Sequence, residues 1–301
     1  MYSNTRTGRP PTRAQHGLIA SPHYLASSTG LDILRDGGSA VDAAIAANAT
    51  LCVVYPHMAG LGGDGFWLIA GDDADVEAIN ASGPAADAAT REYYAELGYD
   101  EIPDRGSASA LTVPGAVDGW RLAHEKHGRL PWERLFEDAI GYAREGVAMT
   151  DDLTRWIALD ADVLSEGSTA AETFLQDGRA PEPGAILRQP DLADSLESIA
   201  THGPRQGFYE GSVADAVCEG LGEESPLSTA DFEQYTAEWV DPLSVDYRGY
   251  RAHSLPPNTQ GIAALQILGL LDGFDVDSWG DGTADYYHHM AEAVKVAFAD
   301  R

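Results

Sequence analysis

The sequence predicts an α+β protein. Two apolar runs, residues 66–70 and 76–80, flank a turn rich in Asp and Gly, which is the pattern of a β-hairpin. From about residue 116 to residue 222 the apolar residues recur mostly at helical spacing. Helices and strands therefore come in groups, and not in strict β-α-β alternation, which favours the α+β class.

The N-terminal part begins with a short apolar run at residues 17–20, which predicts a strand. Ser21 and Pro22 then have the pattern of a helix N-cap followed by proline at the first helical position. Ser39, with Asp42 three residues later, predicts the capped start of a second helix.

The rest of the chain contains both kinds of element. An apolar run predicts a strand at residues 108–113, and alternation of apolar and polar residues predicts a strand with a turn at residues 243–253. Helical spacing predicts further helices at residues 117–127, 131–145, 151–164, 195–202, 260–271 and 285–298.

The composition limits the partners that the chain can have. Its 301 residues include 19 Lys and Arg against 48 Asp and Glu, a formal net charge of −29. Such a chain repels the phosphates of nucleic acids and of anionic membranes, so we expect neither as a partner. Lysine occurs only as Lys126 and Lys295. This pattern is typical of proteins in molar salt, where screening weakens repulsion between carboxylates, and it predicts a halophilic, cytoplasmic protein.

The N-terminal residues, the apolar stretches and the cysteines narrow the class of protein further. Residues 1–15 contain three arginines and no apolar leader segment, and we expect them to form a flexible arm before a single domain at residues 16–301. The longest apolar stretch, residues 262–271, is too short to span a membrane. Cys52 and Cys218 are too few for a disulfide-rich scaffold or a thiolate zinc site.

Residues 60–65 read Gly-Leu-Gly-Gly-Asp-Gly, which satisfies the G-x-G-x-x-G pattern of dinucleotide sites. In those sites a strand precedes the glycines and a helix follows them. Here the predicted order is reversed, so a nucleotide site is only the remote alternative. The favoured interpretation is a turn where backbone approaches backbone or substrate closely. The histidines lack metal-ligand spacing, and we expect no metal and no cofactor.

Several short motifs occur along the chain in a fixed order. They are Gly17-Leu-Ile-Ala-Ser21, Gly37-Gly-Ser-Ala-Val-Asp-Ala-Ala44, Tyr55-Pro-His57, Gly60-Leu-Gly-Gly63, Val113-Pro-Gly-Ala-Val-Asp-Gly119, Phe208-Tyr-Glu-Gly211, Tyr247-Arg-Gly-Tyr250, Pro256-Pro-Asn-Thr-Gln-Gly261 and Glu292-Ala-Val-Lys-Val-Ala-Phe-Ala-Asp-Arg301. As a set they are specific, and they resemble the large subunit of the γ-glutamyltransferase family over nearly all of residues 17–301.

The resemblance implies an N-terminal nucleophile hydrolase with an αββα sandwich, of which this chain is the incomplete large-subunit part. In that family a precursor cleaves itself into a large and a small subunit. The new N-terminal threonine of the small subunit attacks an amide carbonyl, and its own α-amine is the base. The usual donors are glutathione and related γ-glutamyl amides. The resemblance thus implies a γ-glutamyltransferase or glutathione hydrolase that needs its small subunit.

Two departures from the family pattern matter. The chain stops at Arg301, before the family's cleavage site, so we expect the catalytic threonine beyond Arg301 and no catalytic residue within the chain. The family's substrate-holding arginine begins an Arg-Glu-x-Ala-Pro pattern, and the corresponding residues here are Ser82-Gly83-Pro84-Ala85-Ala86. Ser82 is therefore the predicted substrate-binding position, and the nearest following arginine is Arg91.

These departures leave alternatives open. The leading interpretation is the large-subunit part of a γ-glutamyltransferase-family hydrolase. Loss of the arginine would allow an amide acylase of the same fold, similar to cephalosporin acylases, unless another arginine, here or in the missing subunit, holds the carboxylate. A catalytically inactive fragment is a further alternative.

Overall fold

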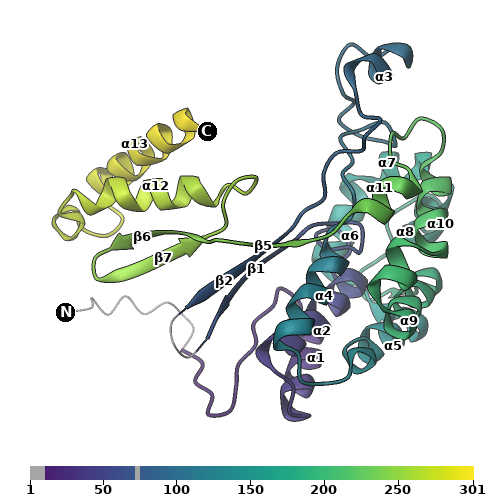
Figure 1. Ribbon diagram of the computed structural model, residues 1–301, viewed down its shortest axis with the longest axis horizontal. Coiled ribbons are helices and arrows are strands. Elements are labelled where there is room, and N and C mark those ends of the chain that lie inside the picture. The colour runs from purple at the N-terminus through teal and green to yellow at the C-terminus, as the bar shows by residue number, and fades with distance from the viewer. Residues whose placement is uncertain (1–10, 72–74) are drawn as a thin grey trace. The chain divides into compact units, whose positions relative to one another are not determined.

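The computed structural model describes residues 11–71 and 75–301, which fall into two compact units (Figure 1). Among the described residues, unit 1 combines residues 11–61 with residues 123–222, and unit 2 combines residues 62–71 and 75–122 with residues 223–301. Residues 1–10 of the expected flexible arm lie outside the described residues, and the boundary between residues 15 and 16 stays a prediction.

Unit 1 begins with two packed helices, α1 (Tyr24–Arg35) and α2 (Ala40–Val54). The predicted start of α2 is confirmed, because the Asp42 backbone N–H donates to Ser39 Oγ at 3.0 Å and the Ser39 N–H donates to Asp42 Oδ2 at 2.8 Å. The predicted start of α1 is wrong. The N-cap is His23, whose Nδ1 accepts the Leu25 N–H, while the Ser21 hydroxyl donates to the His23 carbonyl.

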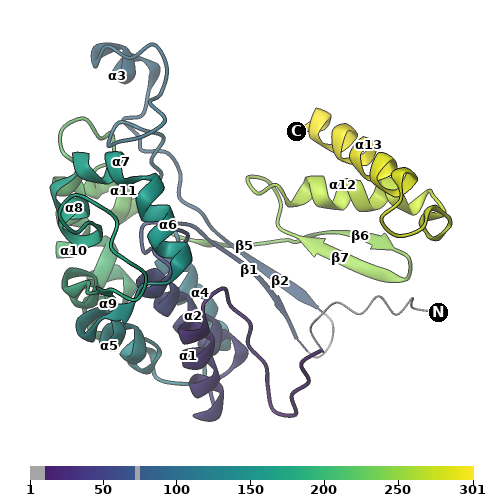
Figure 2. The ribbon, with the colours of Figure 1, turned by 180° about the vertical axis from the view of Figure 1, so that it is seen from behind.

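The remaining elements of unit 1 are mostly short helices. They pack around a core that includes the fully buried Phe136, Leu196 and Ile199, and Figure 2 shows α5 and α9 side by side. The elements are η1 (Trp132–Leu135), α5 (Glu137–Glu145), β3 (Val147–Ala148), α6 (Asp151–Leu159), α7 (Ala161–Glu166), α8 (Ser168–Phe174), β4 (Ile186–Leu187), α9 (Pro190–Pro204), η2 (Arg205–Tyr209) and α10 (Ser212–Leu221).

Unit 2 contains an antiparallel sheet with the strand order β1-β2-β5. The strands are β1 (Gly65–Ala70), β2 (Val76–Ala81) and β5 (Glu238–Val240), and Phe66 pairs with Asn80. The predicted hairpin of residues 66–70 and 76–80 is therefore confirmed. The unit also contains α3 (Arg91–Glu96), the start of α4 (Ala116–His127), α11 (Thr229–Gln234) and η3 (Val276–Trp279).

A second hairpin and two helices complete unit 2. β6 (Leu243–Tyr247) and β7 (Tyr250–Ser254) pair antiparallel, as the alternation at residues 243–253 predicts. Their turn, Arg248-Gly249, has positive φ at both residues, 49° and 82°, which is the geometry of a tight hairpin turn. The predicted helices are confirmed as α12 (Gly261–Asp272), which packs on this hairpin, and α13 (Ala284–Asp300), which packs on α12 (Figure 1).

Several predicted boundaries are wrong. Residues 17–20 form no strand, and among the described residues no strand pairs with them. The expected strand at residues 108–113 is reduced to a single bridge between Thr112 and Ala85. Each of the predicted helices 131–145 and 151–164 is interrupted, at Phe136 and at Asp160. Within the described ranges, no helix has the length and apolar character needed to cross a bilayer.

Candidate substrate-binding site

The glycine-rich turn of residues 60–65 leads from α2 into β1, so a helix precedes it and a strand follows it. This order is the opposite of the one that a dinucleotide site requires. The Gly63 carbonyl accepts hydrogen bonds from the backbone N–H groups of Gly115 and Ala116, at 2.9 and 3.0 Å. The turn therefore binds the first residues of α4, and its role is close packing of backbone segments.

Glycines bring α4 close to the end of β2. A Cβ atom added at Gly115 would lie 2.1 Å from the Ala81 carbonyl oxygen, and one added at Gly119 would lie 2.6 Å from the Ala81 Cβ. Both distances are shorter than atoms tolerate, so only glycine allows this approach. Two glycines of the motif at residues 113–119 thus hold the last residue of β2 in place.

Asp118, from the same motif, holds the third strand of this sheet. Its side chain is fully buried, and it accepts two hydrogen bonds from the Arg121 guanidinium, at 2.6 and 3.0 Å. It also accepts the backbone N–H of Ala237, just before β5, at 2.7 Å. A buried carboxylate that is satisfied in this way ties α4 to the strand that pairs with β2.

Ser82 follows the last residue of β2 and is half-buried. The backbone beyond it is tightly held: a Cβ atom at Gly83 would lie 1.7 Å from the Val113 carbonyl oxygen, and the Val113 N–H donates to the Pro84 carbonyl at 3.0 Å. Ser82 therefore stands between a strand and a fixed crossing segment. The position that the sequence analysis singles out is a rigid one.

A loop between β7 and α12 reaches the same place. Asn258, in this loop, donates a hydrogen bond from Nδ2 to Ser82 Oγ. Asn80 donates from Nδ2 to Asn258 Oδ1 at 3.3 Å, and the Ser82 backbone N–H donates to Asn80 Oδ1 at 3.2 Å. We call Asn80, Ser82 and Asn258 the polar cluster. The motif at residues 256–261 is visible in the sequence, but its contact with Ser82 is not, because only the fold brings the two together.

The polar cluster consists of neutral side chains. Arg91 is the exposed first residue of α3 and forms no hydrogen bond or ion pair with the cluster within the described part of the chain. The cluster can donate and accept neutral hydrogen bonds, but it does not supply the charged, bidentate contact that a guanidinium gives to a carboxylate.

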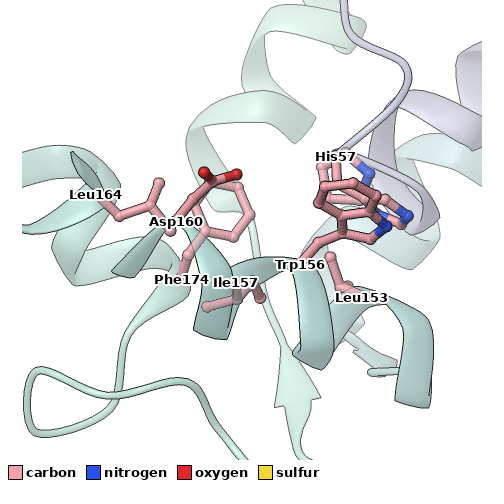
Figure 3. Close-up of a pocket in the computed structure, with 8 residues that line it drawn as sticks. His57, Leu153, Trp156, Ile157, Asp160, Leu164 and Phe174 are labelled. Carbon is pink, nitrogen blue, oxygen red and sulfur yellow. The ribbon is translucent and has the colours of Figure 1, made fainter. Parts of the chain in front are cut away.

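Unit 1 contains a separate apolar cavity of about 120 Å³ (Figure 3). His57 lines it together with Trp156 and Asp160, and the other lining residues are Pro56, Leu153, Ile157, Leu164 and Phe174. His57 Nε2 lies 3.2 Å from Asp152 Oδ2, which gives a histidine–carboxylate pair. None of the described residues that line the cavity is a serine, threonine or cysteine, so they offer the pair no nucleophile to activate.

The described residues give little support to two other kinds of site, a reactive cysteine and a metal centre. Burial raises the pKa of the Cys52 thiol to about 12, so this cysteine stays protonated near neutral pH and is a poor nucleophile. Within residues 11–71 and 75–301, no group of three or more His, Cys, Asp or Glu side chains is placed to hold a metal ion.

Comparison with known proteins gives consistent matches. Residues 26–301 match the family model described as Gamma-glutamyltranspeptidase. The chain is 42% identical over 286 residues to a glutathione hydrolase-like YwrD proenzyme of Bacillus subtilis, covering 94% of this chain and 54% of that protein. It is also 42% identical over 292 residues to an oxamate amidohydrolase proenzyme of Klebsiella pneumoniae, covering 95% and 54%.

A solved structure supports the same relationship. The chain superposes on the crystal structure of a cephalosporin acylase from Bacillus halodurans with a TM-score of 0.89 and 36% identity, covering all of this chain and 57% of that one. The chain therefore spans about half the length of the curated relatives it matches.

Proposed function

Because the chain belongs to the gamma-glutamyltranspeptidase family, we propose that it is the large-subunit part of a two-subunit amide hydrolase or γ-glutamyltransferase. The observation that carries this proposal is that 94% and 95% of the chain match 54% of the length of two relatives that are named proenzymes. In this proposal the same precursor supplies the small subunit. The fold class agrees, since the chain shares its fold with solved N-terminal nucleophile hydrolases of this family.

The proposed reaction is that of an N-terminal nucleophile hydrolase. The N-terminal threonine of the small subunit, beyond Arg301, attacks the amide carbonyl through its hydroxyl oxygen, and its α-amine accepts the hydroxyl proton. The amine of the substrate leaves with that proton, and the acyl group stays on the threonine as an ester. Water then releases the acid, or an amino acid accepts the acyl group. The role of the present chain is to hold the acyl group.

In unit 2, the exposed apolar face of strand β1 supports the proposal of a partner subunit. Phe66 and Leu68 point to the same side of the strand, and each is 45% exposed. In the described sheet β1 is an outer strand, so one edge of its backbone is open. Exposed apolar residues on an open edge are an aggregation hazard unless another chain covers them. We propose that the small subunit covers this face.

The identity of the donor is the open part of this proposal. Ser82 takes the place of the family arginine, and the polar cluster around it is neutral. Loss of a hydrogen bond to a charged group costs about 1.5–3 kcal/mol, or about 10- to 150-fold in affinity. We propose that the complete enzyme uses glutathione poorly. An acylase acting on another amide is the second candidate, and the neutral cluster is the observation that favours it.

The test compares two proteins: residues 1–301 alone, and the precursor completed by a small subunit. Gel electrophoresis follows self-cleavage, and release of p-nitroaniline follows turnover of a panel of acyl p-nitroanilides that includes the γ-glutamyl compound. We expect residues 1–301 alone to do neither, because such an enzyme retains little without its nucleophile and oxyanion donors.

We expect the completed precursor to cleave itself and to hydrolyse at least one of these amides. Robust turnover by residues 1–301 alone would overturn the assignment of the nucleophile. A completed precursor that neither cleaves itself nor hydrolyses any amide of the panel would instead favour the catalytically inactive alternative.

A further inference from the structure

The direction of every hydrogen bond in the polar cluster follows from one backbone group. The Ser82 N–H can only donate, so the Asn80 side-chain atom that it meets is the oxygen, Oδ1. The other end of that amide, Nδ2, is then the atom that faces Asn258. An amide nitrogen can only donate, so Asn258 presents its oxygen to Asn80.

The same logic continues to the serine. With its oxygen toward Asn80, Asn258 turns its own Nδ2 toward Ser82 and donates to the hydroxyl oxygen. Ser82 Oγ is thereby an acceptor in the cluster, and its hydrogen is not used there. Since a hydroxyl has one hydrogen, Ser82 can donate it to a group outside the cluster.

The loop that contains Asn258 is held by contacts of its own. Thr259 Oγ1 donates within the loop toward the Leu255 and Pro256 carbonyls, at 3.2 Å each. A Cβ atom added at Gly261 would lie 1.6 Å from Ser254 Oγ, so the loop runs directly against the end of β7. Asn258 itself is exposed and Ser82 is half-buried, which leaves the cluster accessible.

We infer that Asn258 is a positioning residue that makes Ser82 a hydrogen-bond donor toward the acyl group of the substrate. This inference rests on the proposed function. The cluster then recognises a neutral oxygen acceptor, such as the carbonyl of a carboxamide. A carboxylate at the same place would lose hydration and gain only neutral donors, in a chain whose formal net charge is −29. Asn258 thus determines specificity through Ser82.

The experiment uses the completed two-subunit enzyme and two matched substrates. One is γ-glutamyl p-nitroanilide, with a free α-carboxylate, and the other is the same compound with a neutral α-carboxamide. We expect the unmodified enzyme to have the higher kcat/KM for the carboxamide. In Asn258→Asp the carboxylate cannot donate, so the Ser82 hydroxyl turns to it and is lost to the substrate.

For the carboxamide we expect Asn258→Asp to lower kcat/KM by about 3- to 10-fold, mainly through KM, as the loss of one neutral hydrogen bond predicts. Ser82→Ala removes the same donor without changing any residue of the loop and should give the same loss. The double variant should lose little more than either single one, because both act through one hydroxyl.

The matched control is Gln260→Glu. It makes the same amide-to-carboxylate change two residues away, at an exposed position before α12. We expect it to leave kcat/KM for both substrates unchanged.

Equal effects of Asn258→Asp and Gln260→Glu, or equal loss on both substrates with KM unchanged, would overturn the inference. If Asn258→Asp does not fold, an unchanged KM in Ser82→Ala has the same meaning. If the unmodified enzyme hydrolyses neither of these two amides and no other amide, the proposed function itself is wrong.

Discussion

The carboxylate of Asp118 accepts the backbone N–H of Ala237 at 2.7 Å, across 119 residues of sequence. The same carboxylate is bound by Arg121 and is fully buried. One side chain therefore joins helix α4 to the segment that enters β5. The contact lies at the start of the strand that pairs with β2 next to Ser82 in the three-stranded sheet.

We expect Asp118→Ala to destabilise the protein by about 3 kcal/mol. The change removes the buried acceptor of the Ala237 N–H and of two Arg121 hydrogen bonds, and removing one member of a pair with a buried charge typically costs this much. Urea unfolding monitored by circular dichroism measures the change. The control is Glu172→Ala, which removes an exposed carboxylate from α8 and should change the stability by no more than about 0.5 kcal/mol. Similar losses in both variants would contradict the structural role of Asp118.

A pair of helical glycines tests the close approach of α4 to β2. Gly119→Ala places a Cβ atom where it would lie 2.6 Å from the Ala81 Cβ, whereas Gly141→Ala in α5 meets nothing within 4 Å. We expect Gly141→Ala to stabilise the protein by about 0.5–1 kcal/mol through helix propensity. Gly119→Ala should destabilise it by about 1–3 kcal/mol, because overpacking outweighs the same gain. Thermal unfolding of both variants decides, and equal shifts would disprove the close contact.

The sequence predicts those elements whose signal is local. The hairpin at β1 and β2 and the capped start of α2 depend on neighbouring residues, and both are confirmed. The run at residues 17–20 fails as a strand because a strand needs a partner, which a periodicity cannot reveal. The start of α1 moves to His23 because its ring nitrogen caps the helix, a role that serine more often takes.

The candidate site was predictable only in part. The resemblance to a family pattern identified Ser82, and that position stays a prediction. Asn258 follows Ser82 by 176 residues in sequence, and only the pairing of folded segments brings the two together. Gly115 and Gly119 can be noticed in the sequence, since both belong to one motif. Their common contact with Ala81 cannot be inferred from the sequence.

The N-cap of α1 predicts a pH dependence of stability. Burial lowers the pKa of His23, and its Nδ1 must stay unprotonated to accept the Leu25 N–H. The unfolded chain takes up this proton near about pH 6.5, before the folded chain does. Stability is therefore lost as the pH falls through that value toward the lower pKa of the folded protein.

We expect His23→Asn, which keeps an N-cap acceptor but does not titrate, to reduce this loss. The measurement is the difference in Tm between about pH 7.5 and about pH 5.5, on either side of the unfolded histidine pKa. A variant that loses as much Tm as the unmodified protein over this interval would show that His23 does not contribute. His23→Ala is the control for the cap, because it lowers Tm at both pH values.

The charge of the chain predicts a dependence on salt. With a formal net charge of −29, carboxylates repel one another across the surface in dilute buffer. At roughly 1 M salt the Debye length falls to about 3 Å, which screens most of this repulsion. We expect Tm to rise from dilute buffer to molar KCl, which is the behaviour of the halophilic protein that we propose from composition. A Tm that stays level or falls over this range would count against it.

The last prediction concerns the position of the missing guanidinium. Ser82→Arg introduces a planar cation where the neutral cluster now stands, and a guanidinium can bind an α-carboxylate with two charged hydrogen bonds. In the completed enzyme we expect the ratio of kcat/KM for γ-glutamyl p-nitroanilide over its α-carboxamide counterpart to rise by about 10- to 150-fold, the scale of a charged hydrogen bond. Ser82→Gln is the control, since it adds length without charge, and its effect on the ratio should stay within the about 3- to 10-fold that loss of the Ser82 hydroxyl alone gives. The prediction fails if the unmodified enzyme already prefers the carboxylate substrate strongly and Ser82→Arg does not raise that preference. Such a result would mean that another arginine, here or in the small subunit, holds the carboxylate.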